Sequence, residues 1–281
     1  MNAVEIRNVS KVFNAGRPNA VEALVDIDLT IEPGEFVSLI GPSGCGKSTE
    51  LRLIANLLEP TTGEISVNAK PARQARLDQD YGMAFQQAGL FEWRTVTKNV
   101  ELPLELKGWD KERRRARALE MLDLVKLSDF ADHLPWQLSG GMQQRVAIAR
   151  ALAFQPSILL MDEPFGALDE MTRERMNSEV LRIWEQTGTT VVFVTHSIPE
   201  AVFLSSRVVV MSARPGRITN IVDVDLPRPR NEDTRESPRY FELVTAVREA
   251  LRHRESGEAG SRADDGGLAS PERTMAEGAV G

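Results

Sequence analysis

The densest group of residues suited to chemistry lies between Gly41 and Thr49. Three glycines precede a lysine, and two hydroxyl residues follow it. Glycines leave backbone N–H groups free to surround a phosphate, and the lysine can reach the β- and γ-phosphates of a nucleotide. A Gly-rich turn with a chance lysine is the alternative, but an apolar run precedes this stretch and a helical pattern follows it. The predicted phosphate-binding residues are Gly41, Pro42, Ser43, Gly44, Cys45, Gly46, Lys47, Ser48 and Thr49.

A second group is the acidic pair Asp162-Glu163, which ends the apolar run that begins at Ile158. A buried strand that ends in two carboxylates delivers them to the sheet edge where ligands of open α/β sheets bind. Asp162 is suited to bind Mg²⁺ through its water shell, and Glu163 to polarise an attacking water. A solvated acidic turn is the alternative for such a pair, and the phosphate loop makes it the poorer interpretation.

A third group is Leu138–Arg145, where Ser139, Gly140 and Gly141 stand at the start of a helical pattern. Backbone N–H groups at a helix start can bind an anion. Taken alone, the same residues are more often an ordinary helix N-cap.

The elements around these groups alternate between strand and helix patterns. Apolar runs predict short buried strands, and amphipathic spacing predicts helices, so the sequence predicts an α/β fold with a mostly parallel sheet. The expected strands are at 4–6, 23–31, 36–40, 158–161, 191–195 and 208–211, and the expected helices follow residue 49 and cover 110–127, 142–153, 170–186 and 240–254.

Composition sets further limits. The 281 residues carry 34 Lys and Arg against 41 Asp and Glu, a net charge of −7, which argues against a nucleic-acid partner. A single cysteine, Cys45, excludes a disulfide within the chain and suits a reducing compartment. Neither a secretory leader nor a spanning apolar stretch is evident, so we expect a soluble chain whose membrane role, if any, requires a partner.

The C-terminal fifth of the chain, from about residue 223, changes character. Residues 226–238 are rich in Pro, Arg and acids and predict a linker before the last helix. Residues 255–281 hold six acidic residues against two basic ones and almost no core formers, so we expect a disordered tail that carries more than half of the net charge.

Five ordered motifs together resemble the ATP-binding-cassette ATPases. They are the phosphate loop, FQQ at 85–87, LSGGMQQR at 138–145, LLMDEPFGALD at 159–169, and His196 after VVFVT. The resemblance spans about residues 3–221. It implies a RecA-like core (1–86 and 157–221) with an antiparallel β edge subdomain, an inserted α-helical subdomain (87–156) and a C-terminal extension (222–254).

The resemblance also assigns residues. Phe13 matches the aromatic residue that stacks on adenine, and an ordinary aromatic residue at a strand end is the alternative. Gln86 matches the glutamine that touches Mg²⁺ and the lytic water, and His196 the histidine at the γ-phosphate. Asp169 matches the aspartate that links two protomers.

In this family two cassettes pair head to tail, so each ATP lies between one chain's phosphate loop and the partner's counterparts of Ser139, Gly140, Gly141 and Asp169. The resemblance therefore implies a homodimer, or a pair of cassettes, that binds ATP and Mg²⁺. Hydrolysis would require Lys47, Gln86, Glu163 and His196.

The segment 88–100 resembles importers, and the segment 209–218 with the VDLPRPR that follows resembles the nitrate, sulfonate, taurine and bicarbonate group of importers. This implies a peripheral subunit at the cytoplasmic side of the inner membrane, coupled to integral membrane permease subunits and indirectly to a periplasmic or extracellular solute-binding protein. Leu90, Phe91 and Trp93 are candidate permease contacts, or else they pack inside the helical subdomain.

Two other functions are considered. A soluble cassette in DNA repair, chromosome maintenance or translation usually carries coiled coils, zinc cysteines or two cassettes, and these features are lacking here. A non-hydrolysing regulatory cassette disagrees with intact Lys47, Asp162, Glu163 and His196.

Three residues depart from the family pattern: Glu50 replaces a usual Leu, Asn56 a usual Gly and Glu92 a usual Pro. We expect the charge of Glu50 to weaken ATP binding relative to a Glu50→Leu variant. We also expect alkylation of Cys45, inside the phosphate loop, to block turnover unless ATP protects it.

Overall fold

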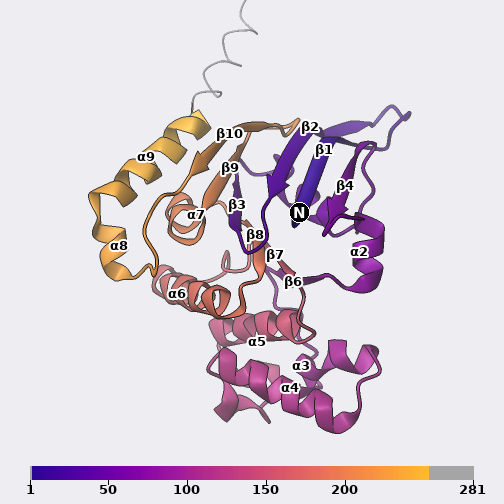
Figure 1. Cartoon of the computed structure of the whole chain (residues 1–281), viewed down its shortest axis with the longest axis vertical. Coiled ribbons are helices and arrows are strands. Elements are labelled where there is room, and N and C mark those ends of the chain that lie inside the picture. Colours follow the sequence, from indigo (N-terminus) through magenta and orange to yellow (C-terminus); the bar gives the residue numbers. More distant parts are fainter. Residues whose placement is uncertain (1, 253–281) are drawn as a thin grey trace, which may run out of the picture.

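The computed structural model describes residues 2–252, which form two β-sheets and a helical region (Figure 1). An antiparallel sheet lies beside a six-stranded sheet, and helices from the middle of the chain lie below both in Figure 1. This arrangement confirms the predicted α/β class with a β edge subdomain and an inserted helical subdomain. The expected disordered tail lies outside the described residues.

The antiparallel sheet has the order β2-β1-β4-β5. Its first two strands are long, and Ile6 of β1 faces Leu29 of β2 and Ile65 of β4. Alternating burial along these strands places one apolar face toward the rest of the core. The bounds are β1 (Val4–Phe13), β2 (Val21–Ile31), β4 (Thr62–Val67) and β5 (Lys70–Pro71).

The six-stranded sheet has the order β10-β9-β3-β8-β7-β6, in which β10 is antiparallel to β9 and the other pairs are parallel. Parallel strands need crossover connections, and helices supply most of them. The bounds are β3 (Phe36–Ile40), β6 (Tyr81–Phe85), β7 (Ile158–Asp162), β8 (Thr190–Val194), β9 (Arg207–Met211) and β10 (Ile218–Asp223).

Most helices begin where side chains cap their free N–H groups. Thr95, Asp110, Ser139, Asp169 and Ser197 each accept a backbone N–H of the helix that follows. The helices are α1 (Lys47–Ile54), α2 (Ala72–Asp78), α3 (Val96–Leu106), α4 (Lys111–Leu124), α5 (Gly140–Leu152), α6 (Glu170–Thr187), α7 (Ile198–Leu204), α8 (Glu232–Glu236) and α9 (Pro238–Arg252), with short turns η1 (Ser128–Phe130) and η2 (Pro135–Gln137).

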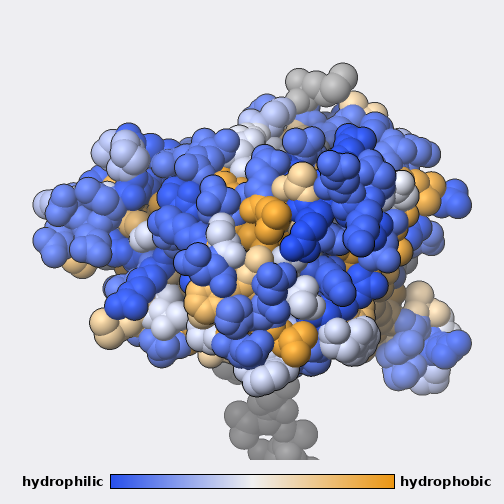
Figure 2. All heavy atoms as spheres, turned by 90° about the horizontal axis from the view of Figure 1, so that it is seen from below, coloured by the Kyte–Doolittle hydropathy of each residue, from blue (hydrophilic) through white to orange (hydrophobic). Residues whose placement is uncertain are grey.

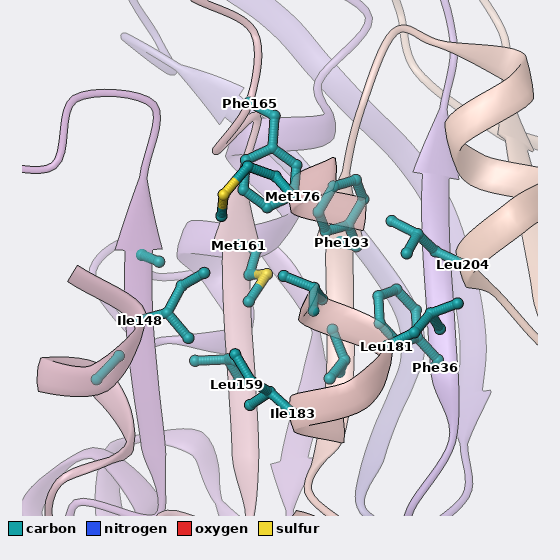
Figure 3. Close-up of a cluster of buried hydrophobic side chains, with 14 of the residues drawn as sticks. Phe36, Ile148, Leu159, Met161, Phe165, Met176, Leu181, Ile183, Phe193 and Leu204 are labelled. Carbon is teal, nitrogen blue, oxygen red and sulfur yellow. The ribbon is translucent and has the colours of Figure 1, made fainter. Parts of the chain in front are cut away.

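The central strands are buried on both faces. In β7, Leu159 and Met161 face the helices α5 and α6, whereas Ile158 and Leu160 belong to the cluster shared with the antiparallel sheet and α1. Figure 3 shows the first of these clusters, with Phe165 and Phe193 near Met176. A sheet covered on both faces explains why β3, β7 and β8 are continuous apolar runs in the sequence.

The helical region is packed directly on the sheet. A Cβ atom at Gly82 of β6 would lie 2.2 Å from the carbonyl oxygen of Ala151, so α5 approaches β6 as closely as a glycine permits. Arg117 of α4 donates to the carbonyl of Ala153 at 2.9 Å. One hydrophobic cluster joins both parts, so the helical region shares its core with the sheet.

The surface at the helical end is mainly hydrophilic, with separate hydrophobic groups (Figure 2). None of the helices within residues 2–252 combines the length and apolar character needed to cross a membrane.

The prediction of a linker at 226–238 is wrong. Arg230 is buried and donates to the carbonyl oxygens of Val202, Phe203 and Ser205 at 2.8–3.1 Å. It thereby satisfies carbonyls at the C-terminal end of α7, which a helix leaves without partners. Burial lowers the pKa of Arg230 to about 9, so it stays charged at neutral pH. The composition of the segment gives no sign that Arg230 is buried and holds it in place.

The last helix agrees with the prediction in position but not in every buried residue. Leu243, Val244 and Val247 of α9 are buried, whereas Phe241 is exposed. The strands β4 and β6 and the helix α3 were not predicted, because they are short, mixed in pattern or, in α3, interrupted by Pro103.

An Arg230→Met variant should lower the free energy of unfolding by at least about 2 kcal/mol, because it leaves several buried carbonyls without a donor. Arg239→Met is the matched control. Arg239 is half-exposed and pairs with Asp225 and Glu242 on the surface, so its loss should cost much less than the loss of Arg230. Urea unfolding of the three proteins measures the difference, and equal losses would contradict the anchoring role.

Candidate functional site

The predicted site residues meet at one edge of the six-stranded sheet. Parallel register aligns Leu39 with Val194, and Val194 with Asp162, and Asp162 with Phe85. The strands β3, β6, β7 and β8 therefore end together, and the residues that follow them are brought to one place. These are the phosphate loop, Gln86, the pair Asp162-Glu163 and His196.

The phosphate loop joins β3 to α1 and depends on glycine at its turn into the helix. Gly46 has a φ of +108°, and a Cβ atom there would lie 2.5 Å from Cδ2 of Leu24. Gly44 also lies in the left-handed region, at +76°. Because no side chain caps α1, its first N–H groups are free to point at an anion.

Lys47 is buried in the loop that it follows. Its ammonium group donates to the carbonyl oxygens of Gly41 at 2.8 Å and Pro42 at 3.1 Å. A positive charge is thus held inside a ring of backbone groups, as the motif predicts.

Two oxygen donors meet beside the lysine. The Ser48 hydroxyl donates to Oδ1 of Asp162 at 2.7 Å, which joins the start of α1 to the end of β7. Among residues 2–252 no group of three His, Cys, Asp or Glu side chains is placed to hold a metal. A pair of oxygens still fits Mg²⁺, which is usually held by one or two protein ligands with water and substrate phosphates.

Glu163 lies in a strained backbone conformation. Its φ is +47°, which is uncommon outside glycine, and its N–H donates to the carbonyl of Val194 at 3.0 Å. Its Oε2 lies 3.4 Å from Nδ1 of His196. The two side chains that the sequence places 33 residues apart are therefore neighbours at the sheet edge.

The turn that carries His196 is organised by residues that were not predicted. Thr195 donates its hydroxyl to Glu200, and it accepts the N–H of Ser197 at 3.0 Å. Burial raises the pKa of Glu200. Thr195 ends the VVFVT stretch that precedes His196, whereas no motif marks Glu200, because its role is to hold the turn after β8.

A hollow of about 240 Å³ opens at this edge. It brings together Phe13, from the end of β1, with the phosphate loop and Glu163. The residues that line it are Phe13, Val21, Ala23, Ser43, Gly44, Gly46, Lys47, Ser48, Thr49, Glu163 and Arg214. Arg214 lies in the connection after β9 and is not among the predicted site residues, so its presence here is new.

Gln86 follows β6 on the other side of the carboxylate pair. Its side chain lies near Gly166, whose added Cβ would be 3.1 Å from Nε2 of Gln86. Gln144 of α5 donates to the carbonyl of Gln86. A second hollow, of about 390 Å³, lies here and includes Gln86, Leu90, Glu92 and Gly140 in its lining.

Ser139 and Asp169 are helix N-caps, of α5 and α6. Their side chains and Gly140 are exposed, and they lie outside the lining of the first hollow within the described residues. The hydrogen bonds that Asp169 accepts from Thr172 lower its pKa. One chain therefore separates these residues from its own phosphate loop, as expected for residues that serve a second protomer.

A sequence model of the ABC transporter family matches residues 24–166, which include the phosphate loop and Asp162-Glu163. The chain belongs to the ABC transporter family. An ABC transporter ATP-binding protein of Methanocaldococcus jannaschii is 50% identical over 87% of this chain and 90% of its own length.

Named relatives are importer subunits. The taurine import ATP-binding protein TauB of Roseobacter denitrificans is 46% identical over 78% of this chain and 81% of its own. The nitrate import ATP-binding protein NrtD of Synechocystis is 44% identical over 91% of this chain and 97% of its own. These relatives do not favour the alternative of a soluble ATPase unconnected with transport.

Solved ABC transporter cassettes share the fold. A dimeric bacterial cassette is 41% identical, covers 79% of this chain and 98% of that one, and has a TM-score of 0.69. A dimeric post-hydrolysis state of that cassette, bound to ADP and Pi, is 40% identical with a TM-score of 0.68. The chain is thus an ABC-type ATP-binding subunit, of a family that hydrolyses ATP.

The structure does not support the expectation that the charge of Glu50 weakens ATP binding. Glu50 is buried, and both of its carboxyl oxygens are without a hydrogen-bond partner among the described residues. Burial raises its pKa to about 8, so the group is mainly neutral at pH 7 and places little negative charge near phosphates.

Asn56, which stands where the family usually has glycine, also has a structural explanation. Its φ is +47°, a left-handed conformation that asparagine tolerates better than most residues.

The expected protection of Cys45 by ATP also needs correction. Cys45 is buried, and burial raises the pKa of its thiol. Reagents attack the thiolate, so this cysteine is shielded before any nucleotide binds.

The burial of Glu50 predicts a pH dependence of stability. Between about pH 4.5 and pH 8 the folded chain holds a proton that the unfolded chain has released, so the free energy of unfolding falls as pH rises. Glu50→Gln removes this proton exchange. Without Mg²⁺ or nucleotide, the variant should gain stability over the wild type by about 1.4 kcal/mol per pH unit across that range.

Urea unfolding at pH 5, 6, 7 and 8 measures this gain. Glu170→Gln, at an exposed position of α6, controls for the loss of one carboxyl group elsewhere. A constant difference between Glu50→Gln and the wild type at all four pH values would contradict the buried, protonated state.

Proposed function

We propose that this chain is the ATP-hydrolysing subunit of an importer that takes up small solutes of the nitrate, sulfonate and taurine kind. The observation that carries the ATPase part is the meeting of Lys47, Ser48, Asp162, Glu163 and His196 at one sheet edge. The importer part is supported by the similarity to taurine and nitrate import proteins.

In this proposal the first hollow holds one ATP. Phe13 covers the adenine, the N–H groups of the phosphate loop and α1 surround the phosphates, and Lys47 moves from its backbone acceptors to the β- and γ-phosphates. Ser48, Asp162 and Gln86 would hold Mg²⁺, which would supply positive charge against the phosphate oxygens. The paired oxygens of Ser48 and Asp162 support this assignment.

Glu163 acts as the general base. It accepts a proton from the attacking water, which then forms a bond to the γ-phosphorus as the bond to the β–γ bridging oxygen breaks. The products are ADP and phosphate. His196 binds the γ-phosphate from its position beside Glu163, and the strained backbone of Glu163 keeps the carboxylate at this place.

A second copy completes the site. Ser139, Gly140 and Asp169 are exposed, Gly141 is buried in the first turn of α5, and all four lie outside the lining of the hollow of their own chain. In a head-to-tail dimer they would meet the partner's ATP. Dimeric solved cassettes support this arrangement.

The membrane partner is proposed to dock near Gln86. Phe91 and Trp93 form an aromatic pair with ring centroids 5.0 Å apart, and Trp93 is 76% exposed. In the sequence, Phe91 and Trp93 adjoin residues that line the second hollow, whose lining includes Gln86 and Leu90. An exposed aromatic pair beside a hollow is typical of a protein contact. We therefore propose that the chain lies at the cytoplasmic face of a membrane, with a separate solute-binding protein as an indirect partner.

Glu163→Gln should keep ATP binding and ATP-dependent dimerisation but lower the turnover number at least about 100-fold, because the amide cannot accept the proton. Phosphate release and size-exclusion chromatography with ATP measure the two effects. Glu170→Gln is the control and should hydrolyse ATP as the wild type does. Normal turnover by Glu163→Gln would contradict the assignment of the base.

Trp93→Ala should reduce copurification with coexpressed permease subunits, since it removes the most exposed half of the aromatic pair. ATPase activity of the free subunit should stay unchanged. Leu77→Ala is the control, because Leu77 is an exposed apolar residue at a different place, on α2. Equal recovery of the permease with both variants would place the contact elsewhere.

A further inference from the structure

Arg214 lines the proposed ATP hollow without belonging to any of the motifs. It lies in the connection between β9 and β10, and its side chain extends over the phosphate loop. Its Nε and Nη2 both approach the carbonyl oxygen of Gly44, each at 3.4 Å. Hydrogen bonds of this length are weak, so Gly44 takes up little of the donor capacity of the guanidinium group.

The backbone that carries Arg214 is fixed against the site. Gly216 accepts the N–H of Val25 at 3.0 Å and donates to the carbonyl of Ala23 at 2.9 Å. A Cβ atom at Gly216 would lie 1.9 Å from the carbonyl oxygen of Cys45, so the connection is seated directly on the phosphate loop. Figure 1 shows the β9–β10 hairpin reaching toward β2, in agreement with these contacts.

Arg214 also differs from its neighbour in charge pairing. Arg217, in the same connection, pairs with Asp26 at 3.1 Å. Within residues 2–252 no carboxylate lies within ion-pair distance of Arg214, which is exposed at the hollow. A guanidinium group presents several donors in one plane, an arrangement that matches phosphate oxygens.

We infer that Arg214 binds the phosphate chain of the nucleotide and is a binding residue of this site, alongside Lys47. The inference rests on the ATP site proposed above and adds a contact from a part of the fold that follows the last motif. Its position against Gly44, within the phosphate loop, favours the phosphates over the adenine. Stacking on the base is the competing role, which the experiment separates.

The test is direct titration of the full chain with ATP, ADP and adenosine, by calorimetry in the presence of Mg²⁺. Arg214→Met should weaken ATP and ADP binding roughly tenfold, because a charge-assisted contact is lost. Adenosine binding should not change. Arg214→Lys keeps the charge but not the planar fork, so it should fall between the wild type and Arg214→Met.

Arg217→Met is the matched control, since it removes an arginine of the same connection that is paired outside the hollow. It should bind all three ligands as the wild type does. Raising the salt concentration should weaken ATP binding by the wild type more than by Arg214→Met. Thermal unfolding without nucleotide checks that each variant is folded.

Unchanged ATP and ADP affinity in Arg214→Met would overturn the inference, as would an equal loss in Arg217→Met. A loss of adenosine affinity as large as the loss for ADP would assign Arg214 to the base and overturn it as well. If the wild-type chain bound no ATP, the proposed function would fail instead, so the two failures are distinguishable.

Discussion

The structure depends on parallel pairing between strands that are buried on both faces. Because β3, β8, β7 and β6 run side by side in register, their carboxyl ends lie along one edge. Burial of both faces holds that register, since a shift by one residue would exchange the two sets of side chains between different cores. The phosphate loop, the carboxylate pair and His196 come from distant parts of the sequence and need no further device to meet.

The motifs were predictable because each combines rare residue types at a fixed spacing beside a strand. Lys47, Asp162 and Glu163 lie where that pattern places them, and the order of strands and helices is largely as expected. Arg214 and Arg230 could not be predicted this way. Their functions arise from contacts with Gly44 and with the carbonyls of α7, which are distant in sequence and leave no periodic signal. The Pro- and Arg-rich composition of residues 226–238 suggested a linker, but buried Arg230 fixes this segment to α7.

Charge in the sequence is also a poor guide to charge at the site. Glu50, one turn into α1, is buried and carries little charge at neutral pH, so the field at the phosphates comes from Lys47, Arg214 and backbone N–H groups. Cys45 occupies the middle of the loop and yet is shielded by its neighbours. In both cases burial decides the chemistry of a residue whose position in the motif suggested the opposite.

The C-terminal extension bears on the site through α7. This helix begins directly after His196, and its far end is held by Arg230, while the Tyr240 hydroxyl donates to the carbonyl of Pro199 at 3.0 Å in its first turn. The extension thus contacts both ends of the helix that follows the histidine. Because Thr195 and Glu200 join the end of β8 to the same helix, a shift of α7 would move His196 relative to Glu163. The extension therefore supports the position of His196 beside Glu163, although none of its residues within 222–252 lines the hollow.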